Sequence, residues 1–148
     1  MGFLKSDEIY NYANDLIEKF DIRGGREGHA AARGMSGGNQ QKAIAAREID
    51  REHKALIAVQ PTRGLDVGAI EYIHKRLIAE RSAGKGILLV SLELDEIMNI
   101  SDRILVMFEG EIVAEADPKQ VTYQELGLYM SGSKRGEVSR PWRKAGNE

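Results

Sequence analysis

The feature that most constrains this chain is a pair of short apolar runs with a helical pattern between them. The first run is ALIAV at residues 55–59, and the second is ILLV followed by a serine at residues 87–91. Strands that are apolar at every position are typical of parallel sheets covered by helices on both faces. The order of strand, helix and strand favours the same architecture. We therefore predict an α/β fold with a mostly parallel sheet, in which residues 55–59 and 87–91 are adjacent and buried.

Helical patterns surround these strands. The first helix, expected over residues 6–20 with Ser6 as its N-cap, has one apolar stripe. That stripe consists of Ile9, Ala13, Leu16, Ile17 and Phe20. A second helix is expected over residues 36–51 after a Gly-rich connection, and a third over residues 66–84. The residues of the third helix expected to face inward are Ile70, Ile73, Leu77 and Ile78.

The remainder of the chain divides into short elements and a basic end. Residues 93–100 read as a short helix, residues 103–116 as a β-hairpin turning near Glu109-Gly110, and residues 122–130 as a helix. From residue 131 basic residues outnumber acidic ones and no periodicity remains, which predicts a flexible tail or a basic arm for anionic lipid or a partner. The predicted organisation is therefore a helical portion at 1–50, a core at 51–130 and a tail at 131–148.

Composition narrows the classes of function. A formal net charge of −2 argues against non-specific binding to nucleic acid, which usually needs a basic surface. The chain has no cysteine, which excludes disulfides and thiolate metal sites. Its three histidines, at positions 29, 53 and 74, lack metal-ligand spacing. The apolar runs are far shorter than the roughly 20 residues that cross a bilayer.

The stretch MSGGNQQK, residues 35–42, places a serine and two glycines at the expected start of the second helix. Glycines let the backbone approach a ligand closely, and the free N–H groups of a first helical turn attract phosphate. The same residues suit an ordinary helix start, with Ser36 as an N-cap after a flexible loop. Alone, this stretch favours the structural cap and leaves a phosphate contact open.

Three further stretches follow in order. ALIAVQPTRGLD, residues 55–66, is a strand followed by Pro-Thr and Gly-Leu-Asp. GILLVSLELDEI, residues 86–97, is a strand ending at a serine before an acidic helix start, and SDRILVMFEGEIVAEAD, residues 101–117, is the hairpin. Together with MSGGNQQK, these stretches resemble the ABC-transporter ATPase family. MSGGNQQK looks like its signature motif, LIAVQP occupies its Walker B strand, GLD its D-loop and LLVSLELDEI its switch-histidine region.

The resemblance covers about residues 6–132 and implies a partial P-loop NTPase (ABC ATPase) fold with flanking helices and a C-terminal hairpin. Asn39 in the signature, together with PTRGLDVGA, is similar to the tandem ATPase subunits of sugar and nucleoside importers. The family would make this chain the C-terminal part of a second ATPase half. It would then act at the cytoplasmic face of the cell membrane as a peripheral subunit.

Several residues that the family needs for hydrolysis are absent or changed. No G-x-x-x-x-G-K-[ST] phosphate loop occurs in the chain. Aligned with the family, Val59 stands at the Walker B aspartate, Gln60 at the catalytic glutamate and Leu92 at the switch histidine. Valine offers no oxygen to Mg²⁺, and an amide cannot accept a proton from water at neutral pH. We therefore expect a degenerate site with no metal ligand, and neither ATP nor Mg²⁺ bound to this chain alone.

In this family two ATPase halves pair head to tail, and the signature of one half caps the ATP held by the other. The resemblance implies that this chain serves the ATP site of a partner half, with Asp66 in the D-loop aligning that site. The implied signature contacts are Ser36, Gly37, Gly38, Asn39 and Gln40. Further implied partners are membrane permease subunits and, indirectly, a substrate-binding lipoprotein, but no nucleic acid.

Two other functions stay open. The chain could belong to a structural or regulatory ABC half that never contributes to hydrolysis, or to an ABC-type ATPase acting on nucleic acid. The latter would need basic surfaces and long coiled coils, which neither the charge nor the patterns of this sequence provide. The sheet of the family also contains strands that this chain lacks, so unpaired apolar edges are expected to promote a homo-oligomer.

Overall fold

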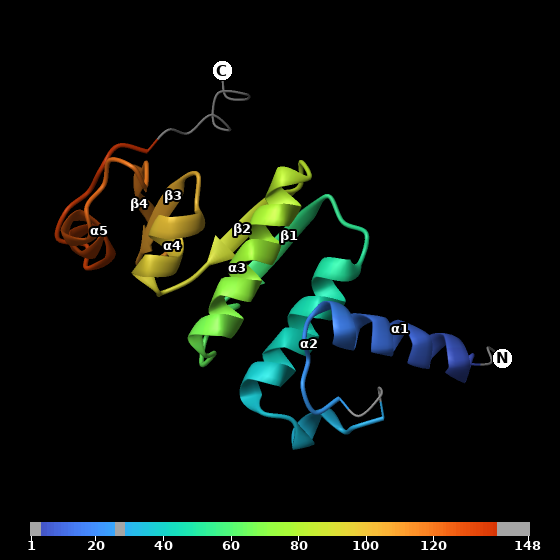
Figure 1. Cartoon of the computed structure of the whole chain (residues 1–148). Helices are drawn as coiled ribbons and strands as arrows, with labels where there is room; N and C mark the ends of the chain where they lie inside the picture. The colour runs from blue at the N-terminus through green and yellow to red at the C-terminus, as the bar shows by residue number, and fades with distance from the viewer. Residues whose placement is uncertain (1–3, 26–28, 139–148) are drawn as a thin grey trace. The chain divides into compact units, whose positions relative to one another are not determined.

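The computed structural model describes residues 4–25 and 29–138, and the last ten positions of the expected tail, 139–148, lie outside this range. The chain forms two compact units, residues 1–90 and 91–148 (Figure 1). The expected boundaries after residues 50 and 130 fall inside these units. Each unit has its own hydrophobic core.

The first unit contains three α-helices, a short 3₁₀ turn and two strands in its described part. They are α1 (Ser6–Lys19), the turn η1 (Ala32–Gly34), α2 (Gly37–Asp50), β1 (Ala55–Val59), α3 (Val67–Ser82) and β2 (Gly86–Val90). The order of helices and strands expected from the sequence is confirmed. The expected cap of α1 is wrong by one residue, because Lys5 is the N-cap and Ser6 already lies in the helix.

The strands β1 and β2 pair in parallel, from Ala55 opposite Gly86 to Val59 opposite Val90. The helix α3 connects them and packs against β2, while α2 packs against both α1 and α3 (Figure 1). The expected adjacency of the two apolar strands is therefore confirmed, together with an α/β fold.

The expectation that both strands are buried is wrong for one face of the pair. Four aliphatic side chains form what we call the bare face, namely Ile57, Val59, Leu88 and Val90, with exposed fractions of 68, 60, 53 and 45%. On the opposite face, Leu56 packs against the core that α1 and α2 build. A strand that is apolar throughout needs a cover on each face. Among the described residues of this unit, helices cover only one.

The core of the first unit gathers where the helices meet. Its buried residues are Leu16, Phe20, Ile22, Ala46 and Ile49. Phe20 is fully buried, and its ring meets the edge of Tyr72 at 5.9 Å between centroids while the guanidinium of Arg76 lies 4.8 Å from its centroid. This packing joins α3 to the end of α1 and thereby fixes the helical side of the parallel pair.

The second unit is a hairpin between two helices. Its elements are α4 (Leu94–Ile100), β3 (Ile104–Phe108), β4 (Glu111–Ala116) and α5 (Tyr123–Met130). Glu109 and Gly110 form the turn with positive φ angles of 48° and 81°, the conformation of a two-residue hairpin turn. The buried residues of this unit include Ile104, Val106, Val113, Ala114 and Leu126.

The start of the expected tail is attached to this hairpin. Gly136 donates its N–H to the carbonyl of Val113 at 2.9 Å, and Glu115 donates its N–H to the carbonyl of Glu137 at 3.0 Å. Residues 136–137 therefore line the outer edge of β4 and satisfy backbone groups that an edge strand would leave open.

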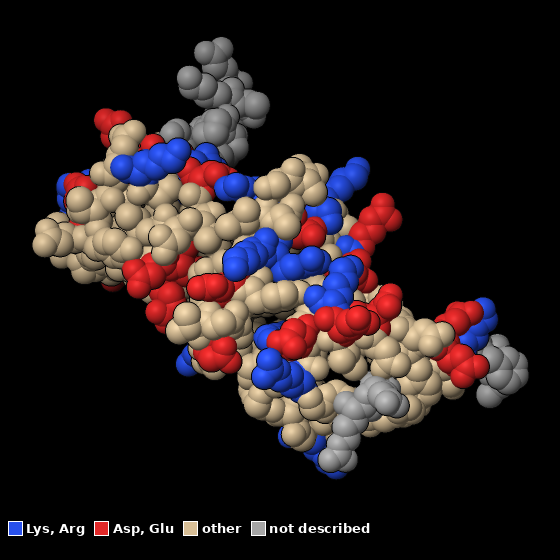
Figure 2. All heavy atoms as spheres, in the orientation of Figure 1, with Lys and Arg blue, Asp and Glu red and all other residues tan. Residues whose placement is uncertain are grey.

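The surface carries charges of both signs. On the face shown in Figure 2, basic and acidic side chains are interspersed and no continuous basic field appears. Within residues 4–25 and 29–138, no helix combines the length and apolar character that crossing a bilayer requires.

Candidate functional site

The start of α2 is built by the signature stretch. Ser36 has extended backbone angles and is the N-cap, and its Oγ accepts a hydrogen bond from the N–H of Asn39 at 3.4 Å. The first helical bond runs from the N–H of Gln40 to the carbonyl of Ser36 at 2.9 Å. The N–H groups of Gly37 and Gly38 precede that bond in the chain, so they belong to the turn whose donors the helix itself cannot pair.

The two glycines leave this turn accessible. A Cβ placed on Gly37 would meet no atom within 4 Å, and one on Gly38 would lie 3.5 Å from Cδ2 of Leu65. Ser36 and Gly37 are exposed, and Gly38 is half-buried. An anionic group could therefore reach the backbone of this turn without displacing a side chain.

Asn39 and Gln40, which the family resemblance suggested as contacts to ATP, use their side-chain amides within the chain. Oδ1 of Asn39 accepts the N–H of Arg23 at 2.7 Å, and Nδ2 of Asn39 donates to Oγ of Ser36 at 2.9 Å. Nε2 of Gln40 donates to the carbonyl of Met35 at 2.9 Å. Sequence reasoning missed these bonds, because the segment of Arg23 has no periodic relation to the signature.

A neighbouring ion pair holds the same segment against α2. Nζ of Lys42 donates to the carbonyl of Asp21 at 3.0 Å and to its carboxylate at 3.2 Å. Asp21 has a positive φ of 44°, and these two bonds keep its turn in place. The hydrogen bond from Lys42 also lowers the pKa of the Asp21 carboxyl below its ordinary value. Residues 21–23 are thus fixed to the first two turns of α2.

The loop after β1 is tied to α2 as well. The N–H of Gln60 donates to the carbonyl of Val90 at 2.8 Å, so this residue continues the parallel pairing past the end of the strand with a φ of 49°. Nε2 of Gln41 donates to the carbonyl of Pro61 at 2.9 Å. Since its backbone sits at the carboxyl end of the sheet, Gln60 occupies the edge where open α/β sheets bind ligands.

Asp66 ends this loop as the N-cap of α3. Its Oδ1 accepts the N–H of Ala69 at 2.9 Å, and its neighbour Leu65 lies beside Gly38. The D-loop stretch and the signature stretch are therefore neighbours in the first unit. The cap also gives Asp66 a structural role that sequence reasoning had not assigned to it.

Two of the three altered positions, Val59 and Leu92, carry exposed apolar side chains. Val59 belongs to the bare face, and Leu92, in the second unit, has an exposed fraction of 72%. Neither side chain can coordinate Mg²⁺, which prefers oxygen ligands. The described residues contain no group of three or more His, Asp and Glu placed to hold a metal. Val59 therefore offers no ligand to Mg²⁺ at the end of β1, whereas the start of α2 offers donors that suit a phosphate.

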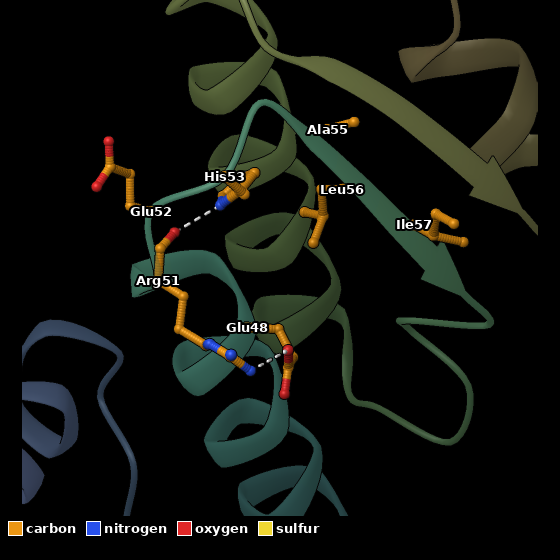
Figure 3. A pocket seen from close by; sticks show the side chains of 7 residues that line it. All are labelled: Glu48, Arg51, Glu52, His53, Ala55, Leu56 and Ile57. Carbon is orange, nitrogen blue, oxygen red and sulfur yellow. Dashed lines mark hydrogen bonds and ion pairs between the residues drawn. The ribbon is translucent and has the colours of Figure 1, made fainter.

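A pocket of about 310 Å³ lies at the other end of β1, where α2 ends and the strand begins (Figure 3). Its lining residues are Glu48, Arg51, Glu52, His53, Ala55, Leu56 and Ile57. Nδ1 of His53 lies 2.6 Å from the carbonyl of Arg51, and the Arg51 guanidinium lies 3.7 Å from Glu48. No residue expected to serve ATP lines this pocket, so it is separate from the signature site.

Comparison with known proteins identifies relatives by sequence. No family model matches the chain. It is 56% identical over 140 residues to the guanosine import ATP-binding protein NupO of Bacillus subtilis, which covers 95% of this chain and 27% of that protein. It is 37% identical over 132 residues to the ribose import ATP-binding protein RbsA of Caldanaerobacter subterraneus, covering 89% of this chain and 26% of that protein. The chain therefore spans about a quarter of the length of these relatives.

Solved structures show the fold. A dimeric structure of MJ0796, a bacterial ABC transporter cassette, matches with a TM-score of 0.67 at 24% identity, over 80% of this chain and 50% of that one. The ATP-binding subunit of another ABC transporter matches with a TM-score of 0.69 at 21% identity, over 86% of this chain and 56% of that one. The chain therefore belongs to the family of ABC-transporter ATP-binding proteins, in the group that includes these nucleoside and sugar import proteins.

Proposed function

We propose that this chain supplies its signature stretch, Ser36 to Gly38, to ATP held by a partner ATPase half of an importer for nucleosides or sugars. The observation that carries the proposal is the helix start itself, which has a serine as its N-cap, an open Gly37, a Gly38 that only Leu65 approaches, and donors that precede the first helical bond. The names of the relatives support the transport of a nucleoside or sugar.

Within this proposal, each residue has a simple physical task. The N–H groups of Gly37 and Gly38 and the hydroxyl of Ser36 donate hydrogen bonds to oxygens of the terminal phosphate. Negative charge on those oxygens grows during transfer, so donors held in place beforehand stabilise the transition state more than the ground state. Asp66, beside this turn, aligns the same site while its carboxylate caps α3.

Under this proposal, the chain does not hydrolyse ATP at the ends of its own strands. Val59, Gln60 and Leu92 replace the three groups that a functional site would use for the metal, the base and the phosphate contact. We propose that residues 1–50 present the signature and residues 51–130 form part of the ATPase core, on the cytoplasmic side of the membrane with permease subunits as partners. Calorimetry of the isolated chain should detect no binding of Mg-ATP, and micromolar affinity would contradict this assignment.

The decisive experiment replaces the matching stretch of the guanosine import protein of B. subtilis by this chain, which is 56% identical to it there. ATP turnover is then compared between this chimera and its Ser36→Ala variant. Removing one preorganised donor to a developing oxyanion typically lowers kcat by about a hundredfold to a thousandfold. We expect a fall of that order, with the KM for ATP changed much less.

A matched control separates catalysis from helix capping. Thr122 caps α5 in the second unit, where its Oγ1 accepts the N–H of Glu125 at 3.2 Å. Thr122→Ala removes a cap of the same kind outside the signature, and it should leave turnover near that of the unaltered chimera. If Ser36→Ala also left turnover unchanged, the chain would instead be a structural or regulatory half.

A further inference from the structure

The hydrogen bonds around Asn39 determine which way the hydroxyl of Ser36 points. We infer that Asn39 is a positioning residue. It engages the acceptor side of the Ser36 hydroxyl, so that this hydroxyl can only donate a hydrogen bond, and its O–H points away from the chain. The role of this arrangement in turnover rests on the proposed function, whereas the arrangement itself can be tested in the isolated chain.

The orientation of the Asn39 amide follows from its partner. The N–H of Arg23 can only donate, and it lies 2.7 Å from the side-chain atom that must therefore be the amide oxygen. The nitrogen end of the amide then faces Oγ of Ser36 at 2.9 Å. The backbone donor of Arg23 thus fixes which end of the Asn39 amide is oxygen and which is nitrogen.

The state of the Ser36 hydroxyl follows in turn. An amide nitrogen can only donate, so Oγ of Ser36 accepts from it, and Oγ also accepts the backbone N–H of Asn39 at 3.4 Å. A hydroxyl has two lone pairs and one proton, and both lone pairs are now engaged. Only the O–H remains, and Ser36 is exposed. Such a group suits an anionic phosphate oxygen and disfavours a cation.

We call the hydrogen-bonded series from Arg23 through Asn39 to Ser36 the clamp. Its Asn39 end lies on α2, and its Arg23 end is held against the same helix. Asn39 and Lys42 lie three residues apart on one face of α2, and Lys42 holds the carbonyl of Asp21, two residues before Arg23. The N–H that fixes the Asn39 amide is therefore itself held against the helix. Asn39 acts on the phosphate through Ser36 and does not need to touch it.

The variant Asn39→Asp tests the polarity of the clamp with little change in shape. One carboxylate oxygen can still accept the N–H of Arg23, but the other now accepts where the amide donated. The hydroxyl of Ser36 should then turn inward and donate to it. In the chimera we expect kcat to fall about a hundredfold, as after loss of an oxyanion donor, with a smaller change in KM. Asn39→Ala, which frees the hydroxyl without reversing it, should cost less.

A double-variant cycle separates this effect from added negative charge. With Ser36→Ala already present, Asn39→Asp should cause little further loss of turnover, because the hydroxyl it reorients is gone. If the two losses instead multiplied, the aspartate would act by its charge alone and the inference would be overturned. Thermal unfolding of each variant, followed by circular dichroism, identifies any loss that comes from misfolding.

A measurement on the 148-residue chain needs no ATP. NMR should detect a coupling across the hydrogen bond between the amide nitrogen of Arg23 and the side-chain carbonyl of Asn39, and Asn39→Ala should abolish it. Absence of this coupling in the unaltered chain overturns the inference whatever the turnover shows. A coupling that is present while Ser36→Ala leaves turnover intact overturns the proposed function, and the role of Asn39 in turnover with it.

Discussion

The two faces of the β1–β2 pair have the same kind of residue and very different surroundings. On one face Leu56 packs into the core shared with α1 and α2, while on the other Ile57, its neighbour in sequence, is 68% exposed. Successive side chains of a strand point to opposite faces, so adjacent aliphatic residues report on two environments. A continuous apolar run therefore indicates that both faces of a strand are suited to burial. It does not show that a second segment is present to cover the other face.

The helical side and the bare face of the β1–β2 pair also differ in the interactions that their side chains make. The helical side carries aromatic packing, ion pairs and a capped helix start, all within the first unit. The bare face carries only aliphatic side chains. Loss of a group on the helical side should therefore cost stability, whereas changes to the bare face should mainly alter association.

The largest effect should follow truncation of the core. Phe20→Ala removes a fully buried ring that contacts Tyr72 and Arg76, and the free energy of unfolding should fall by about 3–5 kcal/mol. Val59→Ala on the bare face should change it by less than about 0.5 kcal/mol. Urea denaturation of both variants checks this difference. Equal costs would mean that the bare face is covered in solution.

The second effect concerns self-association. We expect the isolated chain to associate at rising concentration. Within residues 4–25 and 29–138, β1 and β2 form a sheet of only two strands, so the bare face lies beside two strand edges that could pair with another chain. The double variant Ile57→Lys with Leu88→Lys places two charges on this face and should weaken association at least about tenfold, the equivalent of 1.4 kcal/mol. Light scattering over a concentration series measures it.

The matched control for this experiment changes an exposed helix position. Ile44 on α2 is 51% exposed, and Ile44→Lys adds a charge away from the sheet. It should leave the association unchanged. A monomeric mass at every concentration for the unaltered chain, with a cooperative thermal transition, would contradict the expectation.

The elements of this fold were accessible to sequence reasoning because they depend on local patterns. The runs ALIAV and ILLV predicted two adjacent strands, and Glu109-Gly110 predicted the hairpin turn, since periodicity and turn chemistry act over a few residues. The bare face was not accessible, because exposure depends on whether another segment is present to cover it. The cap of α1 shifted from Ser6 to Lys5, which is within the usual spread of helix boundaries.

In the candidate site, too, local patterns were predictable from the sequence and contacts with distant segments were not. The motif order located Ser36, Gly37 and Gly38 at a helix start, and the structure places them there. The family resemblance also suggested Asn39 and Gln40 as contacts to ATP, and the structure adds that their side-chain amides form hydrogen bonds within the chain. Their direction depends on Arg23 and Met35, and no sequence spacing encodes which backbone group lies opposite an amide.

A smaller effect should come from the cap of α3, the helix that lies against β2 on the covered side. Asp66→Ala removes the carboxylate that accepts the N–H of Ala69 and should cost about 1 kcal/mol of stability. Asp66→Asn keeps a capping oxygen and should cost little, so it is the matched control. If Asp66→Asn lowered turnover in the chimera without lowering stability, the proposed D-loop role would separate from the cap.

The smallest effect should be a dependence of stability on acid pH that belongs to the helical side of the β1–β2 pair and not to its bare face. Asp50 pairs with Lys19 between α1 and α2, and that hydrogen bond lowers the pKa of the Asp50 carboxyl. A carboxyl whose folded pKa lies below its unfolded value, about 3.9, stabilises the fold fully above that value. The stabilisation is lost as the pH falls through the folded pKa.

Asp50→Asn should therefore lower stability at neutral pH and flatten the acid slope, measured by urea denaturation from neutral pH downward. Asp15→Asn on α1 removes an equal charge outside this ion pair and is the control for the loss of one charge. A variant of the bare face such as Val59→Ala should keep the whole slope, because it leaves the ion pair intact, and a flattened slope there would contradict the separation of the two faces.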